Sequence, residues 1–329
     1  MSPRPPSIGE WGGARLDDLV ALAAEALPDE DLTADDLELC CFGDLDRVEV
    51  APSGSASGAT GATTPVGVGS AGSPTTAAGE AGSAGLDDPM VVLGTGDGTG
   101  AVAVVLRPGE VPVGFVQLLA VAPGARRAGV GRALLDAAVD WSFGQGAGAV
   151  RVGGGAPFYL WPGVDVRWTA ALCLAEAAGF VPRGAELNMA CSTRFRAPPP
   201  SGCRVDRPLD EAGAAAALVM VGEHYPQWVP EVGRALEQGT CLAVVETASG
   251  RVTGVGCHSV SRAGWVGPMA TDPAWRGAGV GSAALGAICA DLMSAGYDTA
   301  EICWVGPVRF YASAGGAVSR VFRTLVRRR

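Results

Sequence analysis

Lysine is missing from this sequence, whose 24 basic residues are all arginine. Enzymes that form a Schiff base on lysine are therefore excluded, and so is a P-loop, which needs a lysine to reach the phosphates of its ligand. Histidine is scarce, with only His224 and His258, and no two cysteines have the Cys-x-x-Cys spacing of a zinc site. We therefore expect no metal ion.

Long apolar runs are missing as well. No stretch approaches the roughly 18 uncharged residues that cross a membrane. The first residues, Met1 to Pro6, lack the apolar core of a signal peptide, so we expect a cytoplasmic protein without membrane contact. The nine cysteines are an odd number and fit reduced thiols that pack as small hydrophobic groups.

Acidic residues outnumber basic ones, 34 to 24, and give a net charge of −10 at pH 7. This charge opposes general binding to nucleic acid or to anionic membranes, and we expect neither as a partner. The chain has 329 residues, of which 48% are hydrophobic. At about 150 residues for each domain, that is enough for two hydrophobic cores. A monomer and a homodimer both remain open.

An internal repeat divides the chain. When the sequence is displaced by 150 positions, residues 123–135 align with residues 273–285, and eight of the thirteen pairs are identical. We therefore predict two copies of one domain. The first spans 1–196, the second spans 203–329, and a short proline-rich linker, 197–202, joins them.

Within the first copy, residues 51–89 consist of Ala, Gly, Ser, Thr and Pro with almost no charge, which predicts a flexible insertion. Elsewhere strand and helix patterns alternate in the same order in both copies, which predicts an α/β (α+β) fold with a mixed sheet. The second copy has expected helices at 212–222, 278–295 and 308–314, and strands at 241–245, 252–260, 265–271, 299–305 and 318–326. The first has strands at 102–107, 114–121 and 149–152, and helices at 131–142 and 168–178.

Each copy has the pattern Arg-x-x-Gly-x-Gly where a strand and a proline lead into a helix, from Arg126 to Gly131 and from Arg276 to Gly281. The first amides of a helix lack partners within the helix and attract anions, and glycine lets a phosphate approach closely. A dinucleotide-binding fingerprint needs a third glycine, where this chain has leucine and alanine. Two interpretations of these loops remain: a plain helix start, and a pyrophosphate cradle for coenzyme A.

The wider pattern around both loops is Val/Thr-x-Pro-x-x-Arg-x-x-Gly-x-Gly, from Val121 and from Thr271. It resembles the acetyl-CoA signature of the GNAT N-acetyltransferase superfamily. Residues 306–316, with Phe310 and Tyr311 before a Gly-Gly pair, resemble the second signature of that family. The resemblance covers nearly all of the chain outside the insertion. It implies two tandem GNAT-like domains, each a mixed, splayed β-sheet flanked by helices, with acetyl-CoA lying in the splay.

The resemblance also implies roles for single residues. Tyr311, by its position in the second signature, is the implied acid that returns a proton to the leaving thiolate of coenzyme A. The first copy has Ala175 at the aligned position, so we expect the first domain to be non-catalytic and the second to be catalytic. Glu301, on the strand after the second cradle helix, is a candidate general base. The implied acetyl-CoA-binding residues are Met269, Ala270, Thr271, Arg276, Gly277, Ala278, Gly279, Val280 and Gly281, with Val121, Arg126, Arg127, Gly129 and Gly131 in the first copy.

Candidate acceptor-binding residues are Tyr159, Tyr225, Trp228, His258 and Trp304. Aromatic rings suit the apolar faces of sugars, but they would equally anchor an interface between domains. A weaker resemblance to tandem GNAT enzymes that acetylate glucosamine or glucosaminides implies a small-molecule primary amine, with an amino sugar as one candidate. An aminoglycoside-like or mycothiol-precursor amine is the competing acceptor. A non-catalytic acyl-CoA-binding sensor or partner protein is the competing function.

Overall fold

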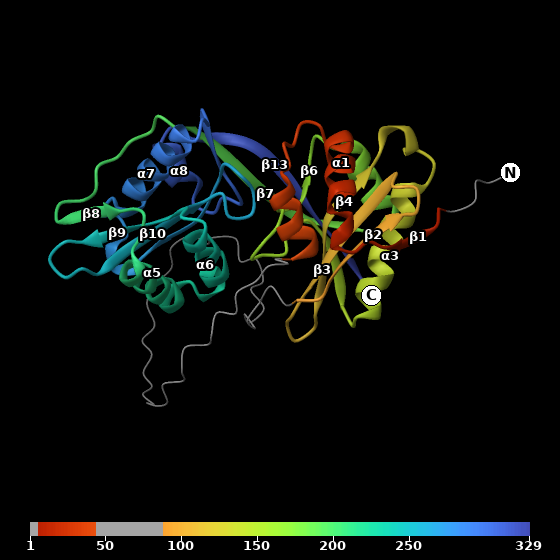
Figure 1. The fold of residues 1–329 in the computed structure, drawn as a ribbon, viewed down its shortest axis with the longest axis horizontal. Coiled ribbons are helices and arrows are strands. Elements are labelled where there is room, and N and C mark those ends of the chain that lie inside the picture. Colours follow the sequence, from red (N-terminus) through yellow and green to blue (C-terminus); the bar gives the residue numbers. More distant parts are fainter. Residues whose placement is uncertain (1–5, 44–87) are drawn as a thin grey trace.

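The computed structural model describes residues 6–43 and 88–329 (Figure 1). The predicted insertion, 51–89, lies outside the described residues except for its last two positions. The elements follow the predicted order in both copies. The strand expected at 299–305 ends at Ile302, because the backbone amide of Val305 has turned away to donate to the carbonyl of Leu187. The prediction was wrong there by three residues.

The first copy contains four helices and seven strands within the described part of the chain. The helices are α1 (Leu16–Ala26), α2 (Ala34–Leu37), α3 (Val130–Gly144) and α4 (Thr169–Ala177). The strands are β1 (Ile8–Glu10), β2 (Met90–Thr95), β3 (Gly100–Arg107), β4 (Val113–Val121), β5 (Ala149–Val152), β6 (Val164–Asp165) and β7 (Val181–Ser192). Short helical turns lie at Gly13–Arg15, Glu38–Phe42 and Pro123–Ala125.

The second copy repeats this plan. Its helices are α5 (Glu211–His224), α6 (Val229–Glu237), α7 (Val280–Ser294) and α8 (Val308–Ser313). Its strands are β8 (Cys203–Asp206), β9 (Cys241–Glu246), β10 (Val252–His258), β11 (Trp265–Thr271), β12 (Thr299–Ile302) and β13 (Ala317–Arg328). Short 3-10 turns lie at Pro226–Trp228 and Pro273–Trp275.

The strands of both copies join into one mixed sheet in the order β1-β2-β3-β4-β5-β13-β7-β12-β11-β10-β9-β8, with β6 paired to β13. The copies exchange their last strands. The end of β13 pairs with β5 of the first copy, and β7 pairs with β12 of the second. Between them β7 and β13 form a long antiparallel ladder at the centre of the molecule (Figure 1). The predicted domain boundaries therefore describe the sequence repeat, whereas backbone hydrogen bonds cross between the copies.

Side chains alternate between the two faces of the sheet, and this divides the apolar core. On β3, Ala101 and Ala103 pack with α1, whereas Val102 and Val104 pack with α3. In the second copy, β9 divides in the same way between α5 and α7. The face with α3 and the face with α7 form separate clusters. The face with α1, α2, α5 and α6 forms one cluster shared by both copies, which holds them together.

All nine cysteines are free thiols, and most of them are buried. No helix among the described residues is long and apolar enough to cross a membrane. Within the same residues, no group of three or more His, Cys, Asp or Glu side chains is placed to hold a metal ion.

The shared cluster encloses an acidic side chain. Glu231 of α6 is 8% exposed, and burial raises the pKa of its carboxyl from an ordinary 4.5 to about 8, although the charge of Arg107 acts in the opposite direction. In the folded protein Glu231 therefore holds its proton over a pH range in which the unfolded chain releases it.

This proton makes a testable contribution to stability. Between pH 4.5 and about 8 the folded state binds more protons at Glu231 than the unfolded state, so rising pH favours unfolding. We expect Glu231→Gln, which stays neutral, to gain stability over wild type as the pH rises through this window. Urea unfolding at both ends of the window measures the difference. An equal pH slope in the two proteins would contradict the assignment.

Candidate acetyl-CoA and acyl-transfer site

In each copy, two parallel strands are paired at their beginnings and then separate. β4 pairs with β5 from Val113 to Val116 and then separates from it, although it stays paired with β3 as far as Val121. β11 pairs with β12 only at Trp265 and Val266 before it runs on to Thr271. The pairing of β4 with β3, and that of β11 with β10, shifts register at the same point. The splay implied by the sequence is therefore present in both copies.

A glycine in the left-handed conformation precedes each cradle helix. Gly129 precedes α3 with φ of 88°, and Gly279 precedes α7 with φ of 93°. Residues other than glycine rarely take this backbone conformation, and glycine has no side chain that could cap the helix. The first amides of both helices are consequently left for an outside acceptor, as an anion site requires.

The second glycine of each signature fits closely against the following helix. A Cβ atom on Gly131 would lie 3.2 Å from Leu174 of α4, and one on Gly281 would lie 3.2 Å from the ring of Phe310 of α8. Because Leu174 and Phe310 hold corresponding positions, the two cradles are built alike. A larger side chain would displace either helix.

A cavity of about 850 Å³ lies over the first cradle, between the separated ends of β4 and β5. This volume is within the range of pockets for small ligands and cofactors, roughly 300–1,000 Å³. Arginine, glycine and apolar residues make up most of its lining, together with the acidic residues Asp29 and Glu30. The arginines and the apolar residues suit a molecule with phosphates at one end and an apolar arm. The lining includes Gln117, Val121, Arg126, Arg127, Gly129, Gly131, Arg132, Trp161, Arg167, Trp168, Leu174 and Ala175. The cavity therefore fits coenzyme A.

Two arginines of the first cradle, Arg126 and Arg127, have different roles. Arg126 donates to the carbonyl of Val121 at 3.1 Å and to that of Ala26 at 2.9 Å, so it ties the loop to the end of α1. Arg127 is exposed and has φ of 63°, a conformation that glycine takes more easily, and Gly277 stands at the aligned position. Arg126 thus shapes the loop, while Arg127 presents its charge to the cavity.

In the second copy a tyrosine hydroxyl stands between the arginine and the strand carbonyl, which are in direct contact in the first copy. The hydroxyl of Tyr225, at the end of α5, donates to the carbonyl of Thr271 at 2.7 Å and accepts from Arg276 at 2.9 Å. Its ring stacks on Trp228 at a centroid distance of 4.8 Å. Tyr225, expected at the acceptor, therefore lies with Thr271 and Arg276 at the cradle. The sequence did not reveal that the ends of α1 and α5 contact the cradle in the same way in the two copies.

Tyr311 lies on α8 in the apolar cluster under α7 and is 8% exposed. Its hydroxyl is 3.8 Å from the sulfur of Met269, on the separated end of β11. That weak contact is the hydroxyl's one hydrogen bond to the described residues. Burial raises the pKa of Tyr311 above its ordinary value, so the hydroxyl stays protonated at neutral pH.

The remaining residues of the second cradle differ in their exposure. Ala270 is buried on β11, Val280 is buried at the start of α7, and Gly277 and Ala278 are exposed in the loop between them. In the first copy, Leu174 and Ala175 occupy the positions of Phe310 and Tyr311, and both line the open cavity. These smaller side chains leave more space between the separated strands of the first copy. In the second copy the ring of Tyr311 takes up that space and carries a hydroxyl.

Glu301 and His258 have hydrogen-bond partners other than Tyr311 and Met269. The carboxylate of Glu301 accepts from Asn188 Nδ2 and from Ser319 Oγ, each at 2.9 Å, and burial raises its pKa. His258 contacts Ser259 Oγ through Nδ1 at 3.1 Å, and burial lowers its pKa. Glu301 is thus a carboxyl group held by two donors on the exchanged strands β7 and β13.

Tyr159 and Trp304 meet across the two copies. Their rings are 5.0 Å apart in an edge-to-face arrangement, and the Tyr159 hydroxyl lies 3.3 Å from Cys303 Sγ. Tyr159 is 5% exposed, within the shared cluster. Of the two interpretations left open for these rings, the interface between copies is the one that this burial fits.

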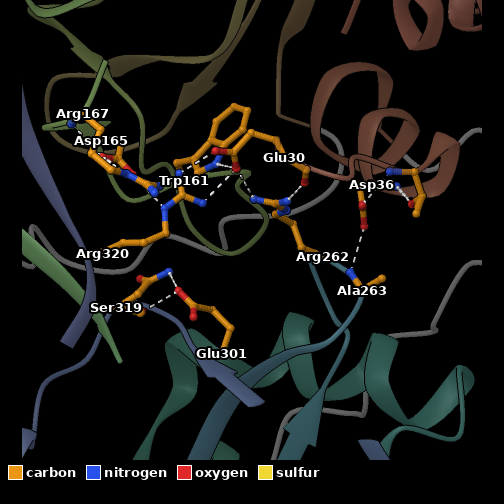
Figure 2. A network of polar contacts seen from close by, with 12 residues as sticks. Glu30, Asp36, Trp161, Asp165, Arg167, Arg262, Ala263, Glu301, Ser319 and Arg320 are labelled. Atoms are coloured by element: carbon orange, nitrogen blue, oxygen red, sulfur yellow. Dashed lines mark hydrogen bonds and ion pairs between the residues drawn. The ribbon is translucent and has the colours of Figure 1, made fainter. Parts of the chain in front are cut away.

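A buried ionic network, which sequence reasoning missed, crosses from the cavity wall to the second copy (Figure 2). Glu30, in the loop after α1, accepts from Trp161 Nε1 at 2.9 Å, from Arg262 at 3.2 Å and from two nitrogens of Arg320 at 2.8 Å. Arg320 also donates to Asp165 at 2.8 Å, which in turn holds Arg167. No local pattern marks Glu30, because its partners are far away in the sequence.

No curated protein sequence matches this chain. Residues 85–156 match the model of the Acetyltransferase (GNAT) family. The chain contains a GNAT acetyltransferase domain. The matched segment includes β2, β3, β4, α3 and β5, and with them the first cradle.

Solved structures share the fold over the whole chain. A glucosamine N-acetyltransferase region of a fungal multi-domain GH3 β-N-acetylglucosaminidase has a TM-score of 0.69 and 16% identity, over 99% of this chain and 38% of the fungal chain. A tandem GNAT protein from the clavulanic acid biosynthesis pathway has a TM-score of 0.65 and 14% identity, over 98% of each chain. A GCN5-related N-acetyltransferase from Sphaerobacter thermophilus has a TM-score of 0.61 and 18% identity, over 100% of this chain and 97% of that one. These likenesses show the tandem GNAT fold.

Proposed function

We propose that this protein is an acetyl-CoA-dependent N-acetyltransferase that acts on the primary amine of a small molecule, with turnover in the second copy. The observation that carries the proposal is the hydroxyl of Tyr311. It is buried, protonated and almost free of hydrogen bonds, and it faces the separated end of β11 beside the second cradle. A proton donor for the leaving thiolate is needed at such a place.

Acetyl-CoA supplies an activated acyl group. The amine nitrogen forms a bond to the thioester carbonyl carbon, the carbon–sulfur bond breaks, and the sulfur takes a proton from Tyr311. The nitrogen gives up the one proton that the amide does not keep, and this proton restores the tyrosine hydroxyl. The amides at the start of α7 would hold the pyrophosphate, and Gly281 lets the ring of Phe310 pack closely beside them. The acceptor amine must lose a proton before it attacks, and Glu301 is the candidate base, held by Asn188 and Ser319.

The first copy offers a second acetyl-CoA site. Its cavity has the cradle, the size and the arginines for the ligand but has Ala175 where the acid would stand. We propose that it binds the same molecule without turning it over. This division gives one catalytic and one binding domain in a cytoplasmic protein, whether it is a monomer or a homodimer.

An amino sugar is the acceptor that we propose first. Support comes from the fold shared with the fungal glucosamine N-acetyltransferase region and from Trp228, a half-buried aromatic side chain. An aminoglycoside-like or mycothiol-precursor amine is the competing acceptor. A screen of amino sugars, aminoglycosides and polyamines for acetyl-CoA-dependent thiol release separates them, and a clear preference for polyamines would overturn the sugar assignment.

Tyr311→Phe tests the catalytic role. The change keeps the ring and its packing and removes only the hydroxyl, whose single contact is weak. We expect kcat to fall by roughly 10²-fold, with acetyl-CoA affinity and melting temperature little changed. Steady-state kinetics on glucosamine measures the effect.

An undiminished kcat in Tyr311→Phe would remove this residue from the mechanism. A complete absence of thiol release by wild type with every amine tested, together with tight acetyl-CoA binding, would instead favour the non-catalytic sensor.

A further inference from the structure

The far end of the first-copy cavity contains an acceptor atom without a donor. Gln117 is 2% exposed and lines the cavity, and its side-chain oxygen Oε1 has no hydrogen-bond partner in the described part of the chain. A buried polar atom without a partner is destabilising, because it has lost water and gained nothing in return. Because the Gln117 residue lines the cavity, a ligand that seats an N–H group against this side chain would supply the missing donor.

The orientation of the Gln117 amide is fixed by its neighbours. Its nitrogen Nε2 donates to the carbonyl of Phe158 at 3.3 Å, and Arg107 donates to the same carbonyl at 3.3 Å. A carbonyl oxygen only accepts, so the amide nitrogen must face Phe158. The oxygen is thereby held on the opposite side and needs a donor from elsewhere.

The position of Gln117 along β4 determines which part of a ligand would reach it. Gln117 directly follows Val116, where β4 makes its last pair with β5, and it lies four residues before Val121 at the cradle. At about 3.3 Å for each residue, the two ends of this segment are roughly 13 Å apart. A molecule with its phosphates on the cradle would therefore bring its opposite end to Gln117.

The second copy lacks this feature, because Gly267 stands at the aligned position. We propose that the cavity end around Gln117 is a subsite that accepts a hydrogen bond from an N–H group of the bound ligand. The inference rests on the proposed function of the cavity. The N–H group can belong to an amide in the pantetheine arm of coenzyme A or to an amine that binds beside it.

Gln117→Met tests the subsite, since methionine has a similar size but neither donor nor acceptor. Titration calorimetry is done in the Gly281→Val background, so that only the first cavity reports. We expect the affinity for coenzyme A to fall about tenfold, while that for adenosine 3′,5′-bisphosphate, which lacks the arm, is unchanged. If the donor is an amine, coenzyme A binding stays constant and glucosamine binding to the coenzyme A-loaded protein falls about tenfold.

Stability without ligand gives a second readout. Gln117→Met should melt no lower than wild type, because it removes an unpaired buried acceptor, and Phe158 keeps its bond from Arg107. A lower melting temperature with unchanged binding of all three probes would show a structural role and overturn the subsite. Failure of wild type to bind coenzyme A at all would overturn the proposed function and the subsite together.

Discussion

Gly281→Val should reduce acetyl transfer by roughly 10³-fold or more. A Cβ atom on Gly281 would already lie 3.2 and 3.3 Å from two atoms of the Phe310 ring, and valine adds two methyl groups beyond it. Those groups must either displace α8, which carries Tyr311, or enter the space that a pyrophosphate needs at the start of α7. Both outcomes misplace the reacting groups. Thiol-release kinetics at saturating acetyl-CoA measures the loss.

Gly131→Val is the matched control in the first copy, where a Cβ would lie 3.2 Å from Leu174. We expect it to abolish coenzyme A binding in the cavity and to leave substantial turnover. The melting temperature of both variants must be recorded, so that unfolding is separated from loss of binding. If Gly131→Val abolished turnover and Gly281→Val did not, the catalytic and binding domains would have to be exchanged.

Glu30→Ala should lower the free energy of unfolding by about 3–5 kcal/mol, because it leaves buried positive charge without its partner. The Glu30 side chain is 4% exposed, and it pairs with Arg262 at 7% and Arg320 at 13% side-chain exposure. The two arginines come from different segments of the second copy, so the loss also loosens the contact between the copies. Urea unfolding followed by tryptophan fluorescence measures it, and Trp161, a partner of Glu30, contributes to that signal.

Asp136→Ala is the control for Glu30→Ala. Asp136 pairs with Arg132 on the surface, at side-chain exposures of 40% and 47%, where an ion pair contributes only about 0–1 kcal/mol. Similar small losses in both variants would show that the Glu30 network does not stabilise the fold. A large loss at Glu30 alone would confirm that its burial, rather than the number of its ion pairs, decides its contribution.

Local patterns in the sequence were enough to place most elements. The strand prediction 265–271 agrees with β11, and the helix prediction 308–314 differs from α8 by one residue. The splay is present in both copies, as the resemblance implied. These features depend on neighbours in the chain, or on a repeat that local spacing reveals. The catalytic role of Tyr311 and the choice of acceptor stay predictions.

Contacts between distant residues could not be predicted in this way. Glu30 and Arg320 are 290 positions apart, and no spacing or composition links them. The role of Tyr225 at the cradle also depended on folding, because α5 brings its hydroxyl to the Thr271 carbonyl 46 residues later. The sequence suggested an acceptor contact for this ring, since an aromatic residue in a loop is compatible with several environments.

The sequence by itself determined the repeat, most of the strands and helices in their order, and the glycines of both cradles. It did not predict α1, α2 and α6, nor the strands β1, β2, β6, β7 and β8. These follow from periodicity, turn chemistry and backbone conformation, which are properties of short segments. Only the tertiary structure decided that β7 and β13 are exchanged, that an open cavity lies over the first cradle, and that a buried network joins the copies. Each of these depends on residues far apart in the chain: backbone pairing joins the exchanged strands, separate elements enclose the cavity, and opposite charges meet in the network.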